Sequence, residues 1–290
     1  MPNLWLQVAL RGSAENIDAI ADFLIERGSP GVAIKKNEVR GYFSEPFDVG
    51  AIRGAACKFL DALESYDKPR VRADVAWRII KEEDWNKRWR RFIKPQKIGK
   101  AFWVTPPWIA PPKLRNRHVI TIEPGMAFGT GSHATTRGCL EFIERVANRL
   151  RKTQWTGLDV GTGSGILSIA MVQLGAARVW GIDNDPVALE VARENLVKNA
   201  VAKSVRLSAM PLNRLRKTFP LVVANLTAET IIDLSAALGA RVAKHGALIL
   251  SGILNSRAER VLDCMTAAGY ILIERKREGQ WTTLLLRRQA

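Results

Sequence analysis

The 290-residue sequence predicts an α/β protein in which a doubly wound parallel sheet follows a small α+β domain. Segments with strand-like and helix-like apolar spacing alternate through residues 118–290, which is typical of a parallel sheet covered by helices on both faces. A glycine-rich turn at Gly161–Gly165 joins one predicted strand to one predicted helix within that region. Residues 1–76 follow a different order of elements, β-α-β-β-α-β. The chain is therefore expected to contain two unlike domains.

The N-terminal domain, residues 1–76, is predicted to be ferredoxin-like. Apolar and polar residues alternate over Leu4–Leu10, and apolar residues recur with helical spacing over Glu15–Glu26. Two strands that turn near Lys36, a second helix and a closing strand then complete the β-α-β-β-α-β order of that fold. The ranges expected for these four elements are 31–34, 38–43, 49–63 and 71–75.

Residues 77–117 are predicted to be a basic, proline-bearing linker between the domains. The segment 68–117 contains fifteen Lys and Arg but four acidic residues, in a chain whose net charge is +16. One interpretation is that the linker contacts RNA phosphates and stacks bases on its aromatic rings. The other is an amphipathic segment whose aromatic residues pack on the protein while its charges stay solvated, as the i, i+4 spacing of Trp85 and Trp89 favours. The aromatic residues concerned are Trp77, Trp85, Trp89, Phe92, Phe102, Trp103 and Trp108.

The most informative motif is the glycine-rich turn itself, which begins directly after a predicted strand that contains Asp159. Glycines allow backbone amides to approach a ligand closely, because they carry no Cβ atom. The next predicted strand ends in Asp183, whose carboxylate could accept both hydroxyls of a ribose. The spacing is Gly-x-Gly-x-Gly rather than Gly-x-Gly-x-x-Gly, which favours a nucleoside ligand without a pyrophosphate. S-adenosylmethionine is such a ligand and is the predicted cofactor.

The C-terminal domain, residues 118–290, ends in an antiparallel pair of strands. Such a reversed strand distinguishes methyltransferase sheets from dinucleotide-binding ones, so this feature agrees with the predicted cofactor. The expected strands are 118–122, 157–160, 178–182, 205–207, 221–224 and 247–251, the expected helices are 137–150, 166–174, 186–199, 228–238 and 256–268, and the expected terminal pair is 270–276 and 280–286.

Ligands of open α/β sheets bind at the carboxyl ends of the strands, so only residues at those ends are candidates for the site. Asp159 could hold the ammonium group of the cofactor, Gly161 and Gly163 present backbone, and Asp183 takes the ribose. Asn225 ends a buried strand and is a candidate both for cofactor binding and for orienting the substrate. The alternative for Asn225 is that it caps the helix that follows. For Asp185 we expect an N-cap ahead of Pro186.

Residues 123–136 resemble the signature of the PrmA family of ribosomal protein methyltransferases. The resemblance extends over essentially the whole chain and includes the linker around Trp85 and the segment Leu250–Leu254. It implies a class I S-adenosylmethionine-dependent methyltransferase that modifies lysine side chains and the α-amino group of protein eleven of the large ribosomal subunit. It also implies that the N-terminal domain recognises that substrate. The cofactor positions that the resemblance carries over are Thr136, Gly161, Asp183 and Asn225. The chain has Glu123, Ser132 and Ala134 where the family usually has Asp, Thr and Pro.

The expected chemistry needs no covalent nucleophile, because the methyl group of a sulfonium is already electrophilic. The enzyme must align a neutral amine with that methyl group and exclude water. Asn225 and main-chain carbonyls are candidates for orienting the amine. His133 is a candidate for the general base, and the alternative is that it caps and packs the helix that follows.

Two other functions stay open at this point. The basic linker and the basic C-terminus suggest an RNA methyltransferase, and a noncatalytic ribosome-binding module would also fit the resemblance. Base-amine methyltransferases commonly place an aromatic residue after the strand that ends at Asn225, whereas this chain has Leu226-Thr227-Ala228. This difference disfavours the RNA methyltransferase.

Composition limits the setting in which the chain works. Its three cysteines are widely separated, so neither a disulfide framework nor a cysteine metal site is expected. No run of eighteen apolar residues is present, and no basic region precedes an apolar run at the N-terminus. We therefore expect a cytoplasmic protein that is monomeric and independent of membranes.

Overall fold

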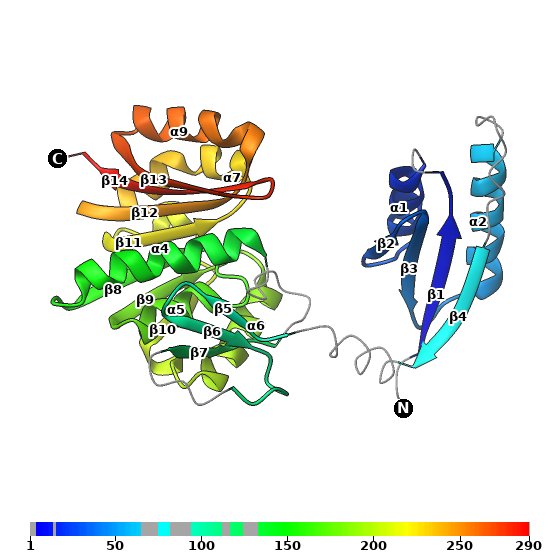
Figure 1. Cartoon of the computed structure of the whole chain (residues 1–290), viewed down its shortest axis with the longest axis horizontal. Coiled ribbons are helices and arrows are strands. Elements are labelled where there is room, and N and C mark those ends of the chain that lie inside the picture. Colours follow the sequence, from blue (N-terminus) through cyan, green and yellow to red (C-terminus); the bar gives the residue numbers. More distant parts are fainter. Residues whose placement is uncertain are drawn as a thin grey trace. The chain divides into compact units, whose positions relative to one another are not determined.

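The computed structural model of the chain describes residues 4–13, 16–64, 75–81, 94–111, 117–123 and 133–289. The chain forms two compact units, Met1–Ile93 and Lys94–Ala290, each with its own sheet (Figure 1). Among the described residues, no helix combines the length and apolar character that crossing a membrane requires.

The N-terminal unit is a four-stranded antiparallel sheet in the order β2-β3-β1-β4, packed against two helices. Apolar residues of β1 that alternate along the strand, Leu6, Val8 and Leu10, are buried together with Leu24 and Leu60 of the helices. The alternation of apolar residues in the sequence therefore predicted correctly which face of β1 is buried. The elements are β1 (Leu4–Arg11), α1 (Ile17–Glu26), β2 (Val32–Lys35), β3 (Glu38–Ser44), α2 (Val49–Glu64) and β4 (Val75–Lys81).

The fourth strand corrects two of the predicted boundaries. The sequence predicts a closing strand at 71–75 and a linker from 77 onward, but β4 spans Val75–Lys81 and pairs with β1 from Val75 to Lys81. Residues 71–74 lie outside the described part of the chain. The prediction was wrong because the charged residues of β4 resemble a basic linker, whereas cross-strand pairing with β1 decides its conformation.

The end of the predicted linker also belongs to a folded unit. Strands β5 (Gln96–Ile98) and β6 (Phe102–Thr105) form a three-stranded sheet with β7 (His118–Thr121). Phe102 is fully buried in the core of the C-terminal unit, so the packing interpretation is confirmed for this residue. The predicted linker residues Trp85, Trp89 and Phe92 lie outside the described part of the chain.

The C-terminal unit contains a seven-stranded sheet in the order β10-β9-β8-β11-β12-β14-β13. Neighbouring strands from β10 to β12 are parallel, and β14 is antiparallel to both β12 and β13. The predicted doubly wound sheet with an antiparallel terminal pair is therefore confirmed. The strands are β8 (Trp155–Val160), β9 (Ala176–Ile182), β10 (Val205–Ser208), β11 (Phe219–Asn225), β12 (Val242–Leu254), β13 (Tyr270–Glu278) and β14 (Trp281–Arg288).

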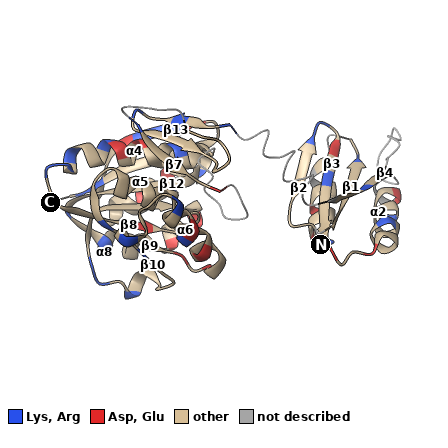
Figure 2. Cartoon of the chain, turned by 90° about the horizontal axis from the view of Figure 1, so that it is seen from below, with Lys and Arg blue, Asp and Glu red and all other residues tan. Residues whose placement is uncertain are grey.

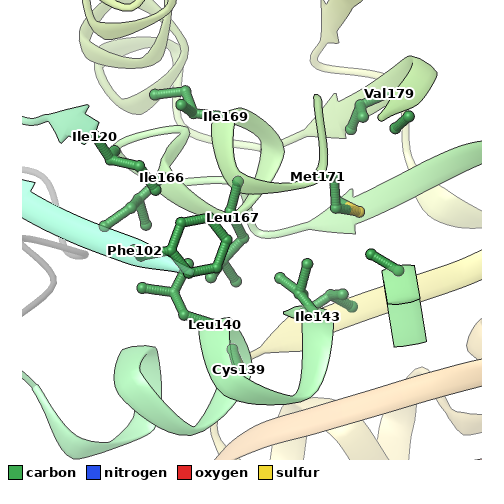
Figure 3. Packing of buried hydrophobic residues seen from close by; sticks show 14 of the residues in the cluster. Phe102, Ile120, Cys139, Leu140, Ile143, Ile166, Leu167, Ile169, Met171 and Val179 are labelled. Atoms are coloured by element: carbon green, nitrogen blue, oxygen red, sulfur yellow. The ribbon is translucent and has the colours of Figure 1, made fainter. Parts of the chain in front are cut away.

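Helices cover both faces of this sheet and separate two apolar cores. The first core lies under α4, α5 and α6, where Phe102 and Ile120 of the small sheet pack with Leu140 of α4 and Ile166 and Leu167 of α5 (Figure 3). The second lies under α7, α8 and α9. The helices are α4 (Ala134–Leu150), α5 (Ile166–Gln173), α6 (Pro186–Lys198), α7 (Ala228–Asp233), α8 (Ser235–Arg241) and α9 (Ala258–Ala267).

Helices α4 and α6 carry charged residues of both signs (Figure 2). Ion pairs join α4 to the antiparallel edge of the sheet, namely Arg137 to Glu278, Arg145 to Glu274 and Lys276 to Glu141.

One predicted helix, 228–238, is corrected to the two helices α7 and α8, because the chain turns at Leu234, whose backbone has φ −92° and ψ 2°.

Candidate active site

Three of the predicted site residues lie at the carboxyl ends of strands that are side by side. Strand β8 lies between β9 and β11, and Val160 is in register with Ile182 on one side and Ala224 on the other. The residues that come next, Gly161, Asp183 and Asn225, therefore meet at one carboxyl edge of the sheet.

The turn after β8 depends on glycine, as two of its positions show. Gly161 has φ 71°, and a Cβ atom there would lie 2.5 Å from the Cδ2 atom of Leu226. Gly165 has φ 80° and forms the N-cap of α5, where a Cβ atom would press on Ala192. Both positions have a left-handed conformation that L side chains rarely adopt. The turn thus leaves bare backbone at the edge of the sheet.

The carboxylate of Asp183 is already oriented by main-chain donors. Its Oδ2 accepts a hydrogen bond of 2.9 Å from the Gly163 amide, and its Oδ1 accepts one of 3.1 Å from the Asp185 amide. Gly163 therefore contributes to the candidate site by holding the Asp183 carboxylate in position. Asp185 accepts a hydrogen bond from the Val187 amide and caps α6, as predicted.

Asp159 is fully buried, and its two oxygens have different surroundings. Oδ2 accepts hydrogen bonds from the hydroxyls of Thr162 and Ser168, both at 2.8 Å, and from the Ser168 amide at 3.1 Å. Oδ1 has no partner among the described residues. Burial raises the pKa of Asp159 to about 6, although the donors on Oδ2 oppose that shift. The sequence did not indicate the roles of Thr162 and Ser168, because neither type of residue is diagnostic by itself.

Thr136 and Asn225 share a feature with Asp159. The Oγ1 atom of Thr136 and the Oδ1 atom of Asn225 are buried and have no hydrogen-bond partner among the described residues. Unpaired buried polar atoms are uncommon in proteins and call for an explanation such as a bound ligand. The capping alternative for Asn225 is wrong, because Thr227 is the N-cap of α7 and accepts from the Thr230 amide.

The first turn of α4 is held to the sheet by a buried polar cluster that the sequence did not predict. The Ser251 hydroxyl donates to the Thr135 carbonyl at 3.2 Å, and it lies 2.7 Å from the hydroxyl of Thr283. Gly138 is required beside this cluster, because a Cβ atom there would overlap the Thr283 hydroxyl. A glycine in an amphipathic helix was the available signal for close approach.

His133 is the N-cap of α4. Its Nδ1 accepts a hydrogen bond from the Thr135 amide at 3.4 Å and lies 2.7 Å from the Thr135 hydroxyl, while its ring meets the edge of Trp281. Burial and the nearby Arg137 lower the pKa of His133 below its usual value, so the imidazole is neutral at pH 7. The capping role is therefore confirmed, and the role of general base stays a prediction.

The side chain of Asn195, which the sequence did not predict as part of the site, connects the glycine-rich turn to Glu123 just after β7. The Asn195 amide is buried, donates to the Ser164 carbonyl at 3.0 Å and accepts from the Glu123 amide at 3.3 Å. Glu123 also forms an ion pair with Lys198, which lies on α6 as Asn195 does. Residues 124–132 of the signature segment 123–136 lie outside the described part of the chain.

Comparison with known proteins agrees with this arrangement. Residues 4–289 match the family model of ribosomal protein L11 methyltransferase (PrmA). The chain belongs to this family. The ribosomal protein L11 methyltransferase of Geobacter metallireducens is 38% identical over 301 residues, which cover 98% of each chain. That of Geobacter sulfurreducens is 37% identical over 306 residues, covering all of both chains.

A solved structure shows the same fold. The ribosomal protein L11 methylase of Lactobacillus delbrueckii subsp. bulgaricus is 28% identical, and it superposes with a TM-score of 0.62 over 68% of this chain and 100% of that chain. The sequence resemblance to the PrmA family is therefore confirmed.

No group of three or more His, Cys, Asp or Glu side chains in the described part of the chain is arranged to hold a metal ion.

Proposed function

We propose that this protein transfers methyl groups from S-adenosylmethionine to amino groups of ribosomal protein L11, acting on lysine side chains and the α-amine. Membership of the PrmA family supports the reaction and the substrate. The observation that carries the proposal is that three buried polar atoms, on Thr136, Asp159 and Asn225, have no partner among the described residues, and that Asp159 and Asn225 lie near Asp183 at one edge of the sheet. A ligand rich in hydroxyl, amine and ammonium groups would pair them.

The residues present fit this cofactor. Asp183 is held by two amides yet retains acceptor capacity on both oxygens, so it can receive two ribose hydroxyls in charge-assisted hydrogen bonds. The unpaired Oδ1 of Asp159 is suited to an ammonium group. The bare backbone at Gly161 allows close approach, and the Thr136 hydroxyl supplies a further polar contact.

When bound, the cofactor supplies an electrophilic methyl group. The protein must then hold the incoming amine in line with that group and keep water away from it. We assign the orientation of the amine to the Oδ1 atom of Asn225, because it is a buried acceptor at the carboxyl edge. A lysine, with an ordinary pKa of about 10.4, must lose its proton first, and desolvation in the site would favour the neutral form.

We assign substrate recognition to the N-terminal unit and its fold to the ferredoxin-like class. The element order β-α-β-β-α-β and the sheet order β2-β3-β1-β4 support this fold. The described residues of this unit lack a buried carboxylate or amide comparable to those of the active site, which agrees with a role in binding. The RNA contact of the basic linker stays a prediction.

The alternative of an RNA methyltransferase has less support. The residue after Asn225 is Leu226, whose side chain lies against Gly161 and whose amide donates to the Ser251 carbonyl at 3.0 Å. Leu226 offers no aromatic ring on which a base could stack.

The test is to incubate purified protein with S-adenosylmethionine and a ribosomal protein extract and to weigh the products by mass spectrometry. We expect mass increases in multiples of one methyl group on ribosomal protein L11. Transfer to RNA alone would support the RNA methyltransferase, and the absence of any transfer would support a noncatalytic ribosome-binding module.

A further inference from the structure

We propose that Ser251 and Thr283 are positioning residues for the active site, which act by fixing the first turn of α4 and with it the cofactor contact of Thr136. Neither residue lies on the glycine-rich turn, and they belong to different strands, β12 and β14. This inference rests on the proposed function, because it assigns a role toward the same cofactor.

The sheet places Ser251 beside the site. Ser251 is in register with Asn225 on the neighbouring parallel strand, so the two side chains point to the same face of the sheet. The Ser251 hydroxyl reaches the Thr135 carbonyl of α4 on that face. Thr136 and Asn225, whose buried oxygens have no partner in the part of the chain that the structure describes, therefore directly adjoin the pair Thr135 and Ser251.

The hydrogen atoms of the cluster can be assigned by counting donors. Ser251 has one hydroxyl proton, which is directed at the Thr135 carbonyl. The 2.7 Å contact between the two hydroxyls must then be donated by Thr283. The result is a chain in which Thr283 donates to Ser251 and Ser251 donates to Thr135. Such chains strengthen each hydrogen bond through polarisation, and burial strengthens them further.

The three residues that form this series of hydrogen bonds are all buried. Thr135 and Ser251 are completely inaccessible to solvent and Thr283 is 3% exposed, so water cannot replace a lost partner. Gly138 lets α4 approach Thr283 closely enough for the contact. The ion pair of Arg137 with Glu278, which lies on β13 beside β14, joins the same turn of α4 to the antiparallel edge. The turn that carries Thr136 is thus placed by β12 and β14 rather than by the glycine-rich turn.

The neighbouring residue on β14 provides a matched control. Thr282 is also completely buried and donates a hydrogen bond of 2.7 Å, but to the Asn255 side chain. Because successive strand residues face opposite sides of a sheet, Thr282 points away from α4. Replacing either threonine with valine preserves the shape of the side chain and removes one buried hydroxyl.

The test compares Thr283→Val, Thr283→Ser and Thr282→Val by calorimetric titration with S-adenosylhomocysteine and by thermal unfolding. For Thr283→Val we expect a dissociation constant raised by about fivefold, the size that one hydrogen bond contributes, and a higher KM for S-adenosylmethionine with kcat changed less. Thr283→Ser, which keeps the hydroxyl, should restore binding. Thr282→Val should lose thermal stability to a similar degree and bind as the wild type does.

Equal affinity of Thr283→Val and wild type would overturn the inference, and so would equal weakening by Thr283→Val and Thr282→Val, since loss of stability alone would then explain both. Failure of the wild type to bind S-adenosylhomocysteine would instead overturn the proposed function together with this inference. Ser251→Ala should weaken binding at least as much as Thr283→Val, because it removes the link to Thr135 itself.

Discussion

The two halves of the active site differ in how completely their polar atoms are paired. In the glycine-loop half, formed by Asp159–Gly165 and Asp183, both oxygens of Asp183 and one oxygen of Asp159 accept hydrogen bonds from the protein. In the helix half, formed by Thr136 and Asn225, the described residues provide no partner for either buried oxygen. The protein itself pairs the polar atoms of the first half except Oδ1 of Asp159, and we propose that ligands complete the second half.

This difference has an energetic meaning. A buried polar atom without a partner costs about 1–3 kcal/mol, so the helix half lowers the stability of the free protein. A ligand that pairs those atoms recovers the cost and gains affinity. Residues of the glycine-loop half should therefore serve both stability and binding, whereas those of the helix half should oppose stability and favour binding.

The largest effect is expected from Asn225→Ala. The variant loses the acceptor to which we assign the orientation of the amine, so turnover should fall about a hundredfold, a typical cost of removing one aligning polar group. Single-turnover methylation of ribosomal protein L11 measures this. Thr227→Ala, which removes the cap of α7, should cost about 1 kcal/mol of stability and leave turnover unchanged. Equal turnover of Asn225→Ala and wild type would contradict the assignment.

Asp183→Ala should have the next largest effect. It removes the proposed ribose acceptor and the carboxylate that accepts from the amides of Gly163 and Asp185, so cofactor affinity should fall roughly tenfold to a hundredfold. Calorimetric titration with S-adenosylhomocysteine checks this. Asp185→Ala is the control, since it removes the α6 cap beside the site and should leave affinity nearly unchanged. If both variants bind like wild type, the ribose role is wrong.

Asp159 gives the glycine-loop half a pH dependence. Its pKa is about 6 in the free protein, so the carboxylate is mostly protonated at pH 5 and mostly ionised at pH 7. Only the ionised form attracts an ammonium group, and cofactor affinity should therefore rise about tenfold between pH 5 and pH 7. Titrations at both pH values measure the slope. The Asp159→Asn variant should bind the cofactor weakly, and its affinity should not change between pH 5 and pH 7. If the affinity of the variant still rises with pH, another group is responsible for the pH dependence.

Thr136→Val separates the two halves most directly. The substitution keeps the volume and removes a buried hydroxyl that has no partner among the described residues, so the free energy of unfolding should rise by about 1 kcal/mol. Cofactor affinity should fall about fivefold at the same time. Denaturant unfolding and calorimetry on the same sample test both. A variant that loses stability as well would show that Thr136 is paired within the free protein.

The sequence predicted the glycine-loop half more fully than the helix half, and the reason is physical. Asp159, Gly161 and Asp183 belong to one strand-helix-strand unit, so their spacing along the chain reflects their spacing in space. Thr136, Asn225 and Ser251 come from three separate elements that meet only when the sheet assembles. Asn225 was predicted because a polar residue ends an apolar strand there, whereas Thr136 was identified through family resemblance alone and the role of Ser251 was not predicted.

The same contrast explains the errors in the fold. The helical apolar period of α4 and the continuous apolar run of β11 predicted both elements to within three residues of their ends. Strand β4 was misplaced because its pairing with β1 is a long-range interaction. The short strands β5 and β6 were included in a linker because their residues form a sheet only with β7, which follows later in the chain.

The smallest effect on turnover is expected at His133, which lies at the start of the helix half. Because Nδ1 of His133 caps α4, His133→Asn should keep the cap, since asparagine is an equally good N-cap residue, whereas His133→Ala should lose about 1 kcal/mol of stability. Asparagine cannot serve as a general base near neutral pH. If His133 only caps the helix, His133→Asn should turn over at the wild-type rate with an unchanged pH profile. A loss of turnover in His133→Asn at wild-type stability would instead make the imidazole the base, and the helix half would then contribute proton transfer as well as ligand pairing.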